Sequence, residues 1–580
     1  MTDTRRRQFT LALMAASLAP AARSAESAPQ GMGNTTESNL DFNPNRYTRQ
    51  DFVLKGLAVD VRAYEGLPTV RRPVDPNYQA LNLYIPDAYF KGGTVGRYNA
   101  QTAPIFLPNA VGGYMPARPA TLAIRVDGPP GGMGGMGGMP EGGRGGAPQG
   151  EGGMGGGPGG ARMGPPSGGM SGSAGGRPGG GPGGAGGPGG PGGAGGARGP
   201  SSGPSTIMQA LARGYIVAAP GARGRTLRAE DGRWIGKAPA AIVDLKAAVR
   251  WLRHNAIANG GRLPGNTERI ISNGTSAGGA LSTLLGASGN HADFARELQA
   301  LGAADQRDDI YAVSAYCPIT NLEHADSAYE WQFHGLSEYR NVAVSMLDFR
   351  AERKETVGRL DAEQQRLSTE LRAQFIAYVN GLNLRGAQGQ PLSLQADGTG
   401  TLRDEILALL MASAQRALDA GQDVTQRDGV RVSQGRVSAV DFAAHVRGMG
   451  RMKGLPAFDG FALETGENQL FGDAQTDLRH FTTFSAQHSR SEGGAFVADP
   501  LTVRQMNAMV YASDDAARPA PHWRIRHGTK DSDTSFAVPT LLAAALRQRQ
   551  LNVDLALPWD RPHSGDYDLD ELFAWIEQRV

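Results

Sequence analysis

The feature that most constrains this chain is the pentad Gly274-Thr-Ser-Ala-Gly278, which follows the apolar pair Ile270-Ile271 and precedes a run of small and apolar residues. This order predicts a strand, a sharp turn and a helix, the arrangement known as a nucleophile elbow. Ser276 would occupy the turn, where the flanking glycines allow strained backbone and a close approach of the helix to the strand. The pentad is common, so the alternative is a glycine-rich turn that merely contains a serine.

Two later segments supply the partners that such a serine needs. His563 lies in a turn-rich segment between a strand predicted over 552–557 and an amphipathic helix predicted over 569–578. Asp531 comes shortly after another predicted strand. The chain order Ser276, Asp531, His563 is the one that α/β-hydrolases use, and it differs from the orders in chymotrypsin and subtilisin.

The chemistry explains why all three residue types are needed. A serine hydroxyl is a weak nucleophile at neutral pH, so we expect His563 to accept the proton of Ser276 and to return it to the leaving alkoxide. Asp531 would orient the imidazole ring and stabilise its protonated form. This chemistry requires neither a metal nor an organic cofactor, and we predict none.

The tetrahedral intermediate also requires hydrogen-bond donors for its oxyanion. We expect one donor to be the backbone N–H of Ala277, immediately after the nucleophile, and the other to come from a loop that follows an early strand. Residues 103–107 form an apolar run that leads into the paired glycines Gly112 and Gly113, whose amides can approach a ligand closely. The alternative for this loop is a plain glycine turn.

Strand and helix patterns alternate along the chain. Residues 214–220 are typical of a buried strand, residues 240–255 of an amphipathic helix, and residues 270–271 of the strand before the elbow. This alternation predicts an α/β fold of the α/β-hydrolase type, with a mostly parallel sheet covered by helices.

Between the predicted catalytic strands the pattern changes to long polar helices, which we predict over 353–380 and 402–418. Such an insertion is well placed to act as a lid, and the alternative is a helical decoration without a chemical role. The predicted parts of the chain are a signal peptide at 1–24, the first part of the hydrolase core at 25–127 and 206–321, a glycine-rich disordered insertion at 128–205, a mainly helical lid at 322–515, and the second part of the core, with the acid and the histidine, at 516–580.

The insertion at 128–205 is dominated by Gly, Pro, Ala and Met and has few charged residues. Its glycines lack a strict three-residue period, which argues against a collagen helix and favours a flexible loop. We expect a tolerated surface loop, and the alternative is a segment that adsorbs to a membrane, a matrix or the substrate material.

Composition excludes several classes of protein. A net charge of +2 over 580 residues, with scattered basic residues, gives no indication of a nucleic-acid partner. The single cysteine, Cys317, excludes an internal disulfide and lies in the apolar run 310–319, where we expect a buried structural thiol. No apolar run after the N-terminus predicts a transmembrane helix.

The N-terminus predicts export. Arg6-Arg7-Gln8-Phe9 precedes a short apolar run at 11–19, which together are typical of a twin-arginine signal with cleavage near Ser24. We therefore expect a periplasmic or secreted protein that folds before export. The alternative is a merely basic, disordered N-terminus.

Several long motifs in one order resemble those of the bacterial tannases, which are α/β-hydrolases that cleave gallate esters and are related to feruloyl esterases. The resemblance covers most of the chain from about residue 50 to the end, apart from the glycine-rich insertion and parts of the middle region. The motifs are Pro108-Asn-Ala-Val-Gly-Gly-Tyr-Met-Pro116, Asn273-Gly-Thr-Ser-Ala-Gly-Gly-Ala-Leu-Ser282, Ala315-Tyr-Cys-Pro-Ile-Thr-Asn321 with Ala328-Tyr-Glu-Trp-Gln332, and Arg526-His-Gly-Thr-Lys-Asp-Ser-Asp533.

The resemblance also implies a galloyl pocket, built from a lysine and a glutamate of the lid and an aspartate two residues after the triad acid. By motif these are Lys453, Glu467 and Asp533. Independently of the family, two carboxylates and an ammonium group suit phenolic hydroxyls, which both donate and accept hydrogen bonds. The alternative for a charged lid residue is a solvated surface position.

We therefore expect a serine esterase of the tannase type, with gallate esters or tannins as its small-molecule aryl ester substrates. One alternative is a feruloyl or other hydroxyaryl esterase with the same triad. An alternative of a different class is a non-catalytic, adhesive interaction protein on a hydrolase scaffold, against which the intact Ser276, Asp531 and His563 argue.

Overall fold

The computed structural model describes residues 37–122, 205–347, 350–492 and 496–580. The predicted signal peptide at 1–24 lies outside the described residues, as does the predicted glycine-rich insertion from residue 128 to residue 204. The expectations for these two segments therefore stay predictions.

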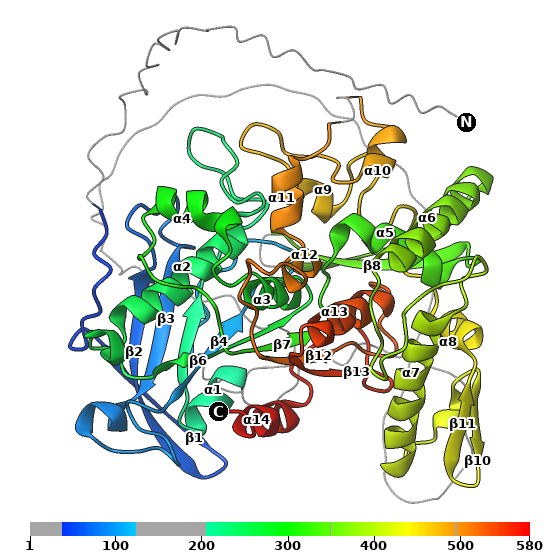
Figure 1. Cartoon of the computed structure of the whole chain (residues 1–580). Helices are drawn as coiled ribbons and strands as arrows, with labels where there is room; N and C mark the ends of the chain where they lie inside the picture. Colours follow the sequence, from blue (N-terminus) through cyan, green and yellow to red (C-terminus); the bar gives the residue numbers. More distant parts are fainter. Residues whose placement is uncertain (1–36, 123–204, 348–349, 493–495) are drawn as a thin grey trace, which may run out of the picture.

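A nine-stranded sheet forms the centre of the molecule, in the order β1-β2-β3-β5-β4-β6-β7-β12-β13 (Figure 1). The pairs from β5 to β13 are parallel, whereas β1, β2 and β3 run antiparallel to their neighbours. The predicted mostly parallel sheet is thereby confirmed. The strands are β1 (Thr48–Leu54), β2 (Leu57–Pro68), β3 (Ala80–Pro86), β4 (Pro104–Asn109), β5 (Ile216–Pro220), β6 (Asn266–Thr275), β7 (Ala312–Tyr316), β12 (His522–Arg526) and β13 (Asn552–Ala556).

Helices cover both faces of this sheet (Figure 1). On one face α1 (Thr206–Ala212) contacts α14 (Leu569–Glu577), whose Phe573 ring lies 5.5 Å from that of Phe106 in β4. On the other face α3 lies directly against β6 and β7. The strands β5 and β7 are buried along their whole length because both faces of the sheet are covered. The helices of this second face and its surroundings are α2 (Ala240–Asn255), α3 (Ala277–Ala287), α4 (Ala295–Leu301), α12 (Ala508–Ala512) and α13 (Ala537–Gln548).

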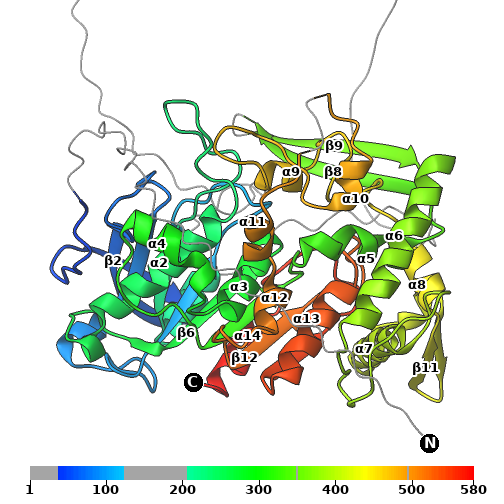
Figure 2. The ribbon, with the colours of Figure 1, turned by 45° about the horizontal axis from the view of Figure 1, so that its top comes forward.

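The segment between β7 and β12 forms a separate group of elements beside the sheet (Figures 1 and 2). It contains two antiparallel hairpins in addition to helices, and the hairpins were not predicted. The prediction of a helix over 353–380 is wrong for the first residues, because β9 extends to Arg359. The helix itself begins at Ala362 and is capped by Asp361. The elements are α5 (Leu322–Phe333), β8 (Glu338–Leu347), β9 (Arg350–Arg359), α6 (Ala362–Gly381), α7 (Thr401–Asp419), β10 (Val430–Ser433), β11 (Arg436–Val440), α8 (Phe442–Met449), α9 (Gly466–Leu470), α10 (Thr483–Gln487) and α11 (Pro500–Gln505).

One large buried apolar cluster joins the sheet, its covering helices and much of the inserted segment. The described residues also include four short 3₁₀ helices, η1 (Asp87–Lys91), η2 (Ile257–Asn259), η3 (Ala292–Phe294) and η4 (Val424–Gln426). No helix in the described parts of the chain has both the length and the apolar character that crossing a bilayer requires.

Candidate active site

The predicted elbow is formed by the junction of β6 and α3. Ser276 is the single residue between them and has φ 59° and ψ −123°, a conformation that a non-glycine residue adopts only at a cost. Its backbone N–H donates to the carbonyl oxygen of Tyr316 at 3.0 Å, which ties the turn to the end of β7. The strained serine therefore lies at the carboxyl edge of the sheet.

The two glycines of the pentad are required by close backbone contacts. A Cβ on Gly274 would lie 2.3 Å from the carbonyl oxygen of Gly278. A Cβ on Gly278 would lie 2.8 Å from the carbonyl oxygen of Val111. Only glycine at these positions allows α3 to begin this close to both β6 and the loop after β4.

The acid and the histidine lie in the loops that follow the neighbouring strands β12 and β13. His563 Nδ1 lies 2.9 Å from Oδ2 of the fully buried Asp531. Burial raises the pKa of Asp531, but the positive charges of His563 and His527 outweigh it and lower this pKa to about 2. Burial likewise lowers the pKa of His563, and the charge of Asp531 outweighs it and holds this pKa well above its usual value.

Cys317 lies beside both the serine and the histidine. It follows β7, is 1% exposed, and has its Sγ 3.9 Å from His563 Nε2 and 3.5 Å from the carbonyl oxygen of Ser564. Burial raises the pKa of the thiol, while His563 and the backbone amide of Ser276 lower it in part. Both residues are described, and no hydrogen bond joins Ser276 Oγ to His563; the thiol neighbours the backbone amide of Ser276 and Nε2 of His563.

Cys317, Asp531 and His563 each have one possible metal-ligand atom, and these three atoms lie within 4.8 Å of one another. No other such group of histidine, cysteine or acidic side chains occurs among the described residues. Asp531 Oδ2 is already engaged by His563 Nδ1. The group is therefore organised as a carboxylate–imidazole pair beside a buried thiol.

The loop after β4 is docked against the elbow. Asn109 Nδ2 donates to the carbonyl oxygen of Gly278 at 3.1 Å, and Gly113, which has φ +54°, accepts a bond of 2.9 Å from Arg225 Nε at its carbonyl oxygen. Ala277 is the first residue of α3, so its N–H has no partner within the helix. The structure thus brings the exposed Gly112–Gly113 turn and the amide of Ala277 to the same edge of the sheet.

Lys453 and Asp533, which are 80 positions apart in the chain, form an ion pair of 3.3 Å between Nζ and Oδ1. The backbone N–H of Asp533 donates to Asp531 Oδ1 at 3.0 Å, so the aspartate of this pair is fastened to the triad acid. Its second oxygen, Oδ2, is buried and has no hydrogen-bond partner. A buried acceptor left unpaired in this way is available to a donor from a ligand.

Lys453 is positioned by a buried network below it. The guanidinium of Arg451 pairs with Glu330 of α5 and donates from Nε to the carbonyl oxygen of Lys453 at 2.7 Å. The hydroxyl of Tyr329 accepts bonds of 3.0 Å from the backbone amides of Met452 and Lys453. These contacts fix the backbone on which the ammonium group is presented.

Glu467 lies in the first turn of α9, where the helix is capped by Thr465. Burial raises the pKa of Glu467, while the ammonium group of Lys453 lowers it in part. Asn468, the next residue, donates from Nδ2 to Asp459 at 2.7 Å, which anchors α9 to the rest of the inserted segment. The structure therefore brings the three charged residues expected for a galloyl pocket into one electrostatically coupled group.

Two further residues border this group and were not identified from the sequence. Burial raises the pKa of Tyr114, and the negative charge of Glu467 raises it further. Burial lowers the pKa of Arg225, and the negative charge of Glu467 opposes this decrease. Both residues therefore lie within electrostatic range of Glu467. Tyr114 follows the paired glycines in the quoted motif, but Arg225 is remote in sequence from each partner, so no spacing pattern could have found it.

Comparisons with known proteins agree with this geometry. A family model described as BD-FAE matches residues 194–360. The structure of a tannase from Lactobacillus plantarum is 39% identical, with 93% of this chain and 99% of that chain covered and a TM-score of 0.76. The Fusobacterium nucleatum tannase is 37% identical, with 93% and 99% covered and a TM-score of 0.76.

A structure of tannin acyl hydrolase in complex with ethyl gallate is 39% identical, with 93% of this chain and 98% of that chain covered and a TM-score of 0.74. A search of curated proteins found no significant match. Identity of this size over nearly the whole length of both chains shows common family membership. The chain belongs to the bacterial tannase family, and it is a carboxylic ester hydrolase with the α/β-hydrolase fold.

Proposed function

We propose that this protein hydrolyses galloyl esters of tannins to gallic acid through an acyl-enzyme intermediate on Ser276. The observation that carries the proposal is the Lys453–Asp533 ion pair, because Asp533 is bonded to the triad acid and retains an unpaired buried oxygen. Relatives in complex with ethyl gallate and with 3,4-dihydroxybenzoate support a hydroxyaryl ligand at this site.

In the proposed reaction Ser276 Oγ attacks the ester carbonyl carbon while its proton passes to Nε2 of His563. The charge of Asp531 stabilises the resulting imidazolium, in keeping with the raised pKa of His563. The C–O bond to the alcohol breaks as His563 returns the proton to the leaving oxygen. Water then attacks the acyl-enzyme by the same route and releases the acid.

The carbonyl oxygen becomes negative in both tetrahedral intermediates and needs donors in a fixed position. We assign this role to the backbone N–H of Ala277 and to the Gly112–Gly113 turn. The elbow holds Ala277 at the start of α3, and Arg225 holds the turn through its bond to the carbonyl oxygen of Gly113. Donors that are fixed before substrate arrives need no reorganisation during the reaction, which makes them effective.

We assign recognition of the aromatic ring to Lys453, Glu467 and Asp533. A phenolic hydroxyl can donate to Asp533 Oδ2 or to Glu467 and accept from the ammonium group of Lys453. Binding a substrate without hydroxyls would leave these buried groups unpaired, which penalises the wrong ester. The site therefore favours substrates with several adjacent hydroxyls over substrates with one.

A feruloyl or other hydroxyaryl esterase is the second candidate, favoured by the BD-FAE match over residues 194–360. The deciding experiment compares kcat/KM of the purified protein for methyl gallate and methyl ferulate. We expect methyl gallate to be preferred by at least about tenfold, since each buried polar group left unpaired costs about 1–3 kcal/mol. A preference for methyl ferulate would assign the second function, and hydrolysis of neither ester would contradict an aryl esterase.

We also propose that the protein is exported through the twin-arginine route, on the basis of Arg6-Arg7 and the short apolar run that follows. Replacing both arginines with lysine should leave the precursor in the cytoplasm. Fractionation of cells that express the full chain would measure this. Export of the Lys-Lys variant at the normal level would contradict the proposal.

A further inference from the structure

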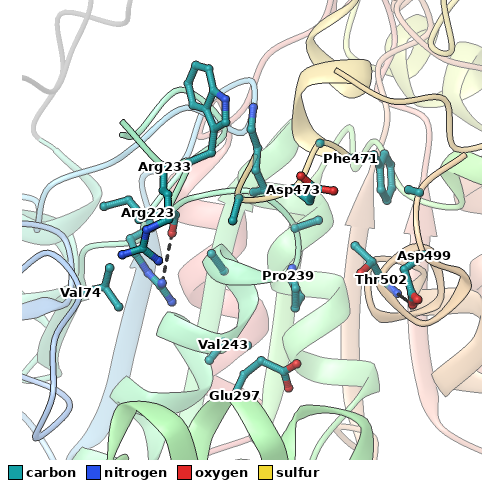
Figure 3. A pocket seen from close by; sticks show the side chains of 18 of the residues that line it. Val74, Arg223, Arg233, Pro239, Val243, Glu297, Phe471, Asp473, Asp499 and Thr502 are labelled. Carbon is teal, nitrogen blue, oxygen red and sulfur yellow. Dashed lines mark hydrogen bonds between the residues drawn. The ribbon is translucent and has the colours of Figure 1, made fainter. Parts of the chain in front are cut away.

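A second cavity, of about 480 Å³, lies at the carboxyl edge of the sheet but outside the catalytic group. It is bounded by the start of α2, by α4, by the segment after α9 and by the start of α11 (Figure 3). Its size is within the range of small-molecule sites in proteins. The strand β5, which leads into the cavity wall, is separated from β6 and the elbow by β4 alone.

The cavity and the catalytic site share a wall. Glu467, on the catalytic side, and Phe471, which lines the cavity, are one helical turn apart at α9. Arg225 on the catalytic side and Arg223 in the cavity wall belong to one segment. Lys237 Nζ donates to the carbonyl oxygen of Gln469 at 2.8 Å, which fastens the two parts of this wall together.

The cavity offers an unsatisfied acceptor. Oε2 of Glu297 is buried without a hydrogen-bond partner, and no hydrogen bond or ion pair to its carboxylate occurs in the described structure. Figure 3 shows Glu297 on the α4 side of the space, with Val243 above it and Phe471 and Asp473 across from it. A ligand that donates hydrogen bonds therefore finds a free acceptor at one end.

The cationic residues of the wall do not make this an anion site, because their charges are already paired. Arg223 forms a bond of 2.9 Å with Asp244, and Lys237 pairs with Asp477. Most of the remaining lining is apolar or aromatic, which suits a flat ring rather than a free phosphate or carboxylate. This lining includes Trp234, Ile235, Pro239, Val243, Leu301 and Phe471.

We propose that this cavity binds a second hydroxyaryl group of a substrate that carries several such groups on one alcohol. The inference rests on the proposed function, since one galloyl group occupies the catalytic site while a neighbouring group of the same molecule enters the cavity. Its ring contacts the apolar wall and a phenolic hydroxyl donates to Glu297 Oε2. Multiply esterified substrates thereby gain affinity that a simple alkyl ester does not.

The experiment compares methyl gallate with pentagalloylglucose in the full-length enzyme. We expect KM for pentagalloylglucose to rise at least fivefold in each of three variants, Glu297→Gln, Glu297→Ala and Ala300→Trp. The tryptophan is chosen to fill the cavity from an exposed position of α4. All three should leave kcat and KM for methyl gallate within twofold. Glu571→Gln is the matched control, since Glu571 likewise lies in the first turn of its helix, α14, but does not line the cavity.

Three outcomes would overturn the inference. Unchanged KM for pentagalloylglucose in Glu297→Ala and Ala300→Trp would show that no part of the substrate enters the cavity. An equal loss on both esters would mean that the shared wall merely supports the catalytic site. If added gallic acid inhibited methyl gallate hydrolysis in wild type but not in Ala300→Trp, the cavity would bind a free gallate molecule rather than a second ring of the bound substrate. Failure of the proposed function is distinguishable, because wild-type enzyme would then prefer methyl ferulate to methyl gallate or hydrolyse neither ester.

Discussion

Lys453 Nζ and Asp533 Oδ1 lie 3.3 Å apart, and the two side chains are 15% and 13% exposed. The lysine belongs to the inserted segment and the aspartate to the catalytic core, two residues from Asp531. Asp533, to which we assign ring recognition, and the triad acid therefore belong to one short loop.

From this pair we predict a loss that depends on the substrate. Lys453→Met and Asp533→Ala should lower kcat/KM for methyl gallate about 10- to 100-fold and for methyl benzoate less than threefold, because only the gallate ring pairs with these groups. Lys530→Met is a matched control, since that lysine lies in the same loop and pairs with the exposed Asp560. Equal losses on both esters would instead assign Lys453 and Asp533 to support of the fold.

Ser276→Ala should lower kcat by several orders of magnitude and leave the melting temperature nearly unchanged. The hydroxyl forms the acyl bond, and alanine retains the Cβ in the same strained conformation. Ser282→Ala should behave in the opposite way, because it removes a buried hydroxyl of α3 that accepts a bond of 2.9 Å from Ser272 of β6. Substantial turnover by pure Ser276→Ala protein would contradict the nucleophile assignment.

The pH dependence should report the contact between His563 and Asp531. Activity requires neutral His563, so kcat/KM should fall as the pH falls through the pKa that Asp531 raises. Asp531→Asn removes that charge, which leaves burial to lower the pKa of His563, so the acidic limb should move to lower pH. The same substitution should reduce kcat by about 10⁴-fold, because asparagine holds the imidazole in the wrong tautomer. The surface change Asp560→Asn is the control and should leave the acidic limb of the pH profile in place. If the acidic limb also stays in place in Asp531→Asn, His563 is excluded as the titrating base.

Cys317 should be dispensable for catalysis although it touches the histidine. Burial raises the pKa of the thiol, so it stays protonated and unreactive at neutral pH. We expect Cys317→Ala to keep kcat within about threefold and to lower the free energy of unfolding by about 1 kcal/mol. Loss of activity on the scale of Ser276→Ala would show that the thiol takes part in the reaction.

Deletion of residues 131–200 should leave methyl gallate kinetics and the melting temperature nearly unchanged. The segment contains few large apolar side chains, and halving a loop changes its closure free energy by only about 0.6 kcal/mol. Retention on insoluble tannin, measured in parallel, tests the alternative role in adsorption. A large fall in kcat on the small soluble ester would mean that the segment shapes the active site.

Local patterns in the sequence were sufficient for much of the catalytic core. The helix predicted over 240–255 coincides with α2, and the elbow lies where the pentad placed it, because apolar periodicity and closely packed glycines act over a few residues. The same local rules failed at residues 353–359, where β9 pairs with β8 instead of continuing the following helix. Strand pairing in a hairpin overrode the helical pattern of an otherwise polar segment.

The sequence by itself determined the residue types, their order and the motifs from which the family could be recognised. Only the tertiary structure decided that Cys317 meets His563, that Arg225 meets Gly113, and that Lys453 and Asp533, which the resemblance places in one pocket, form a direct ion pair. These contacts join loops at one edge of the sheet, and their partners are separated by 80 to 246 positions. The physical reason is that parallel strands bring the ends of distant segments to the same edge, and side-chain contacts there depend on packing that no local pattern encodes.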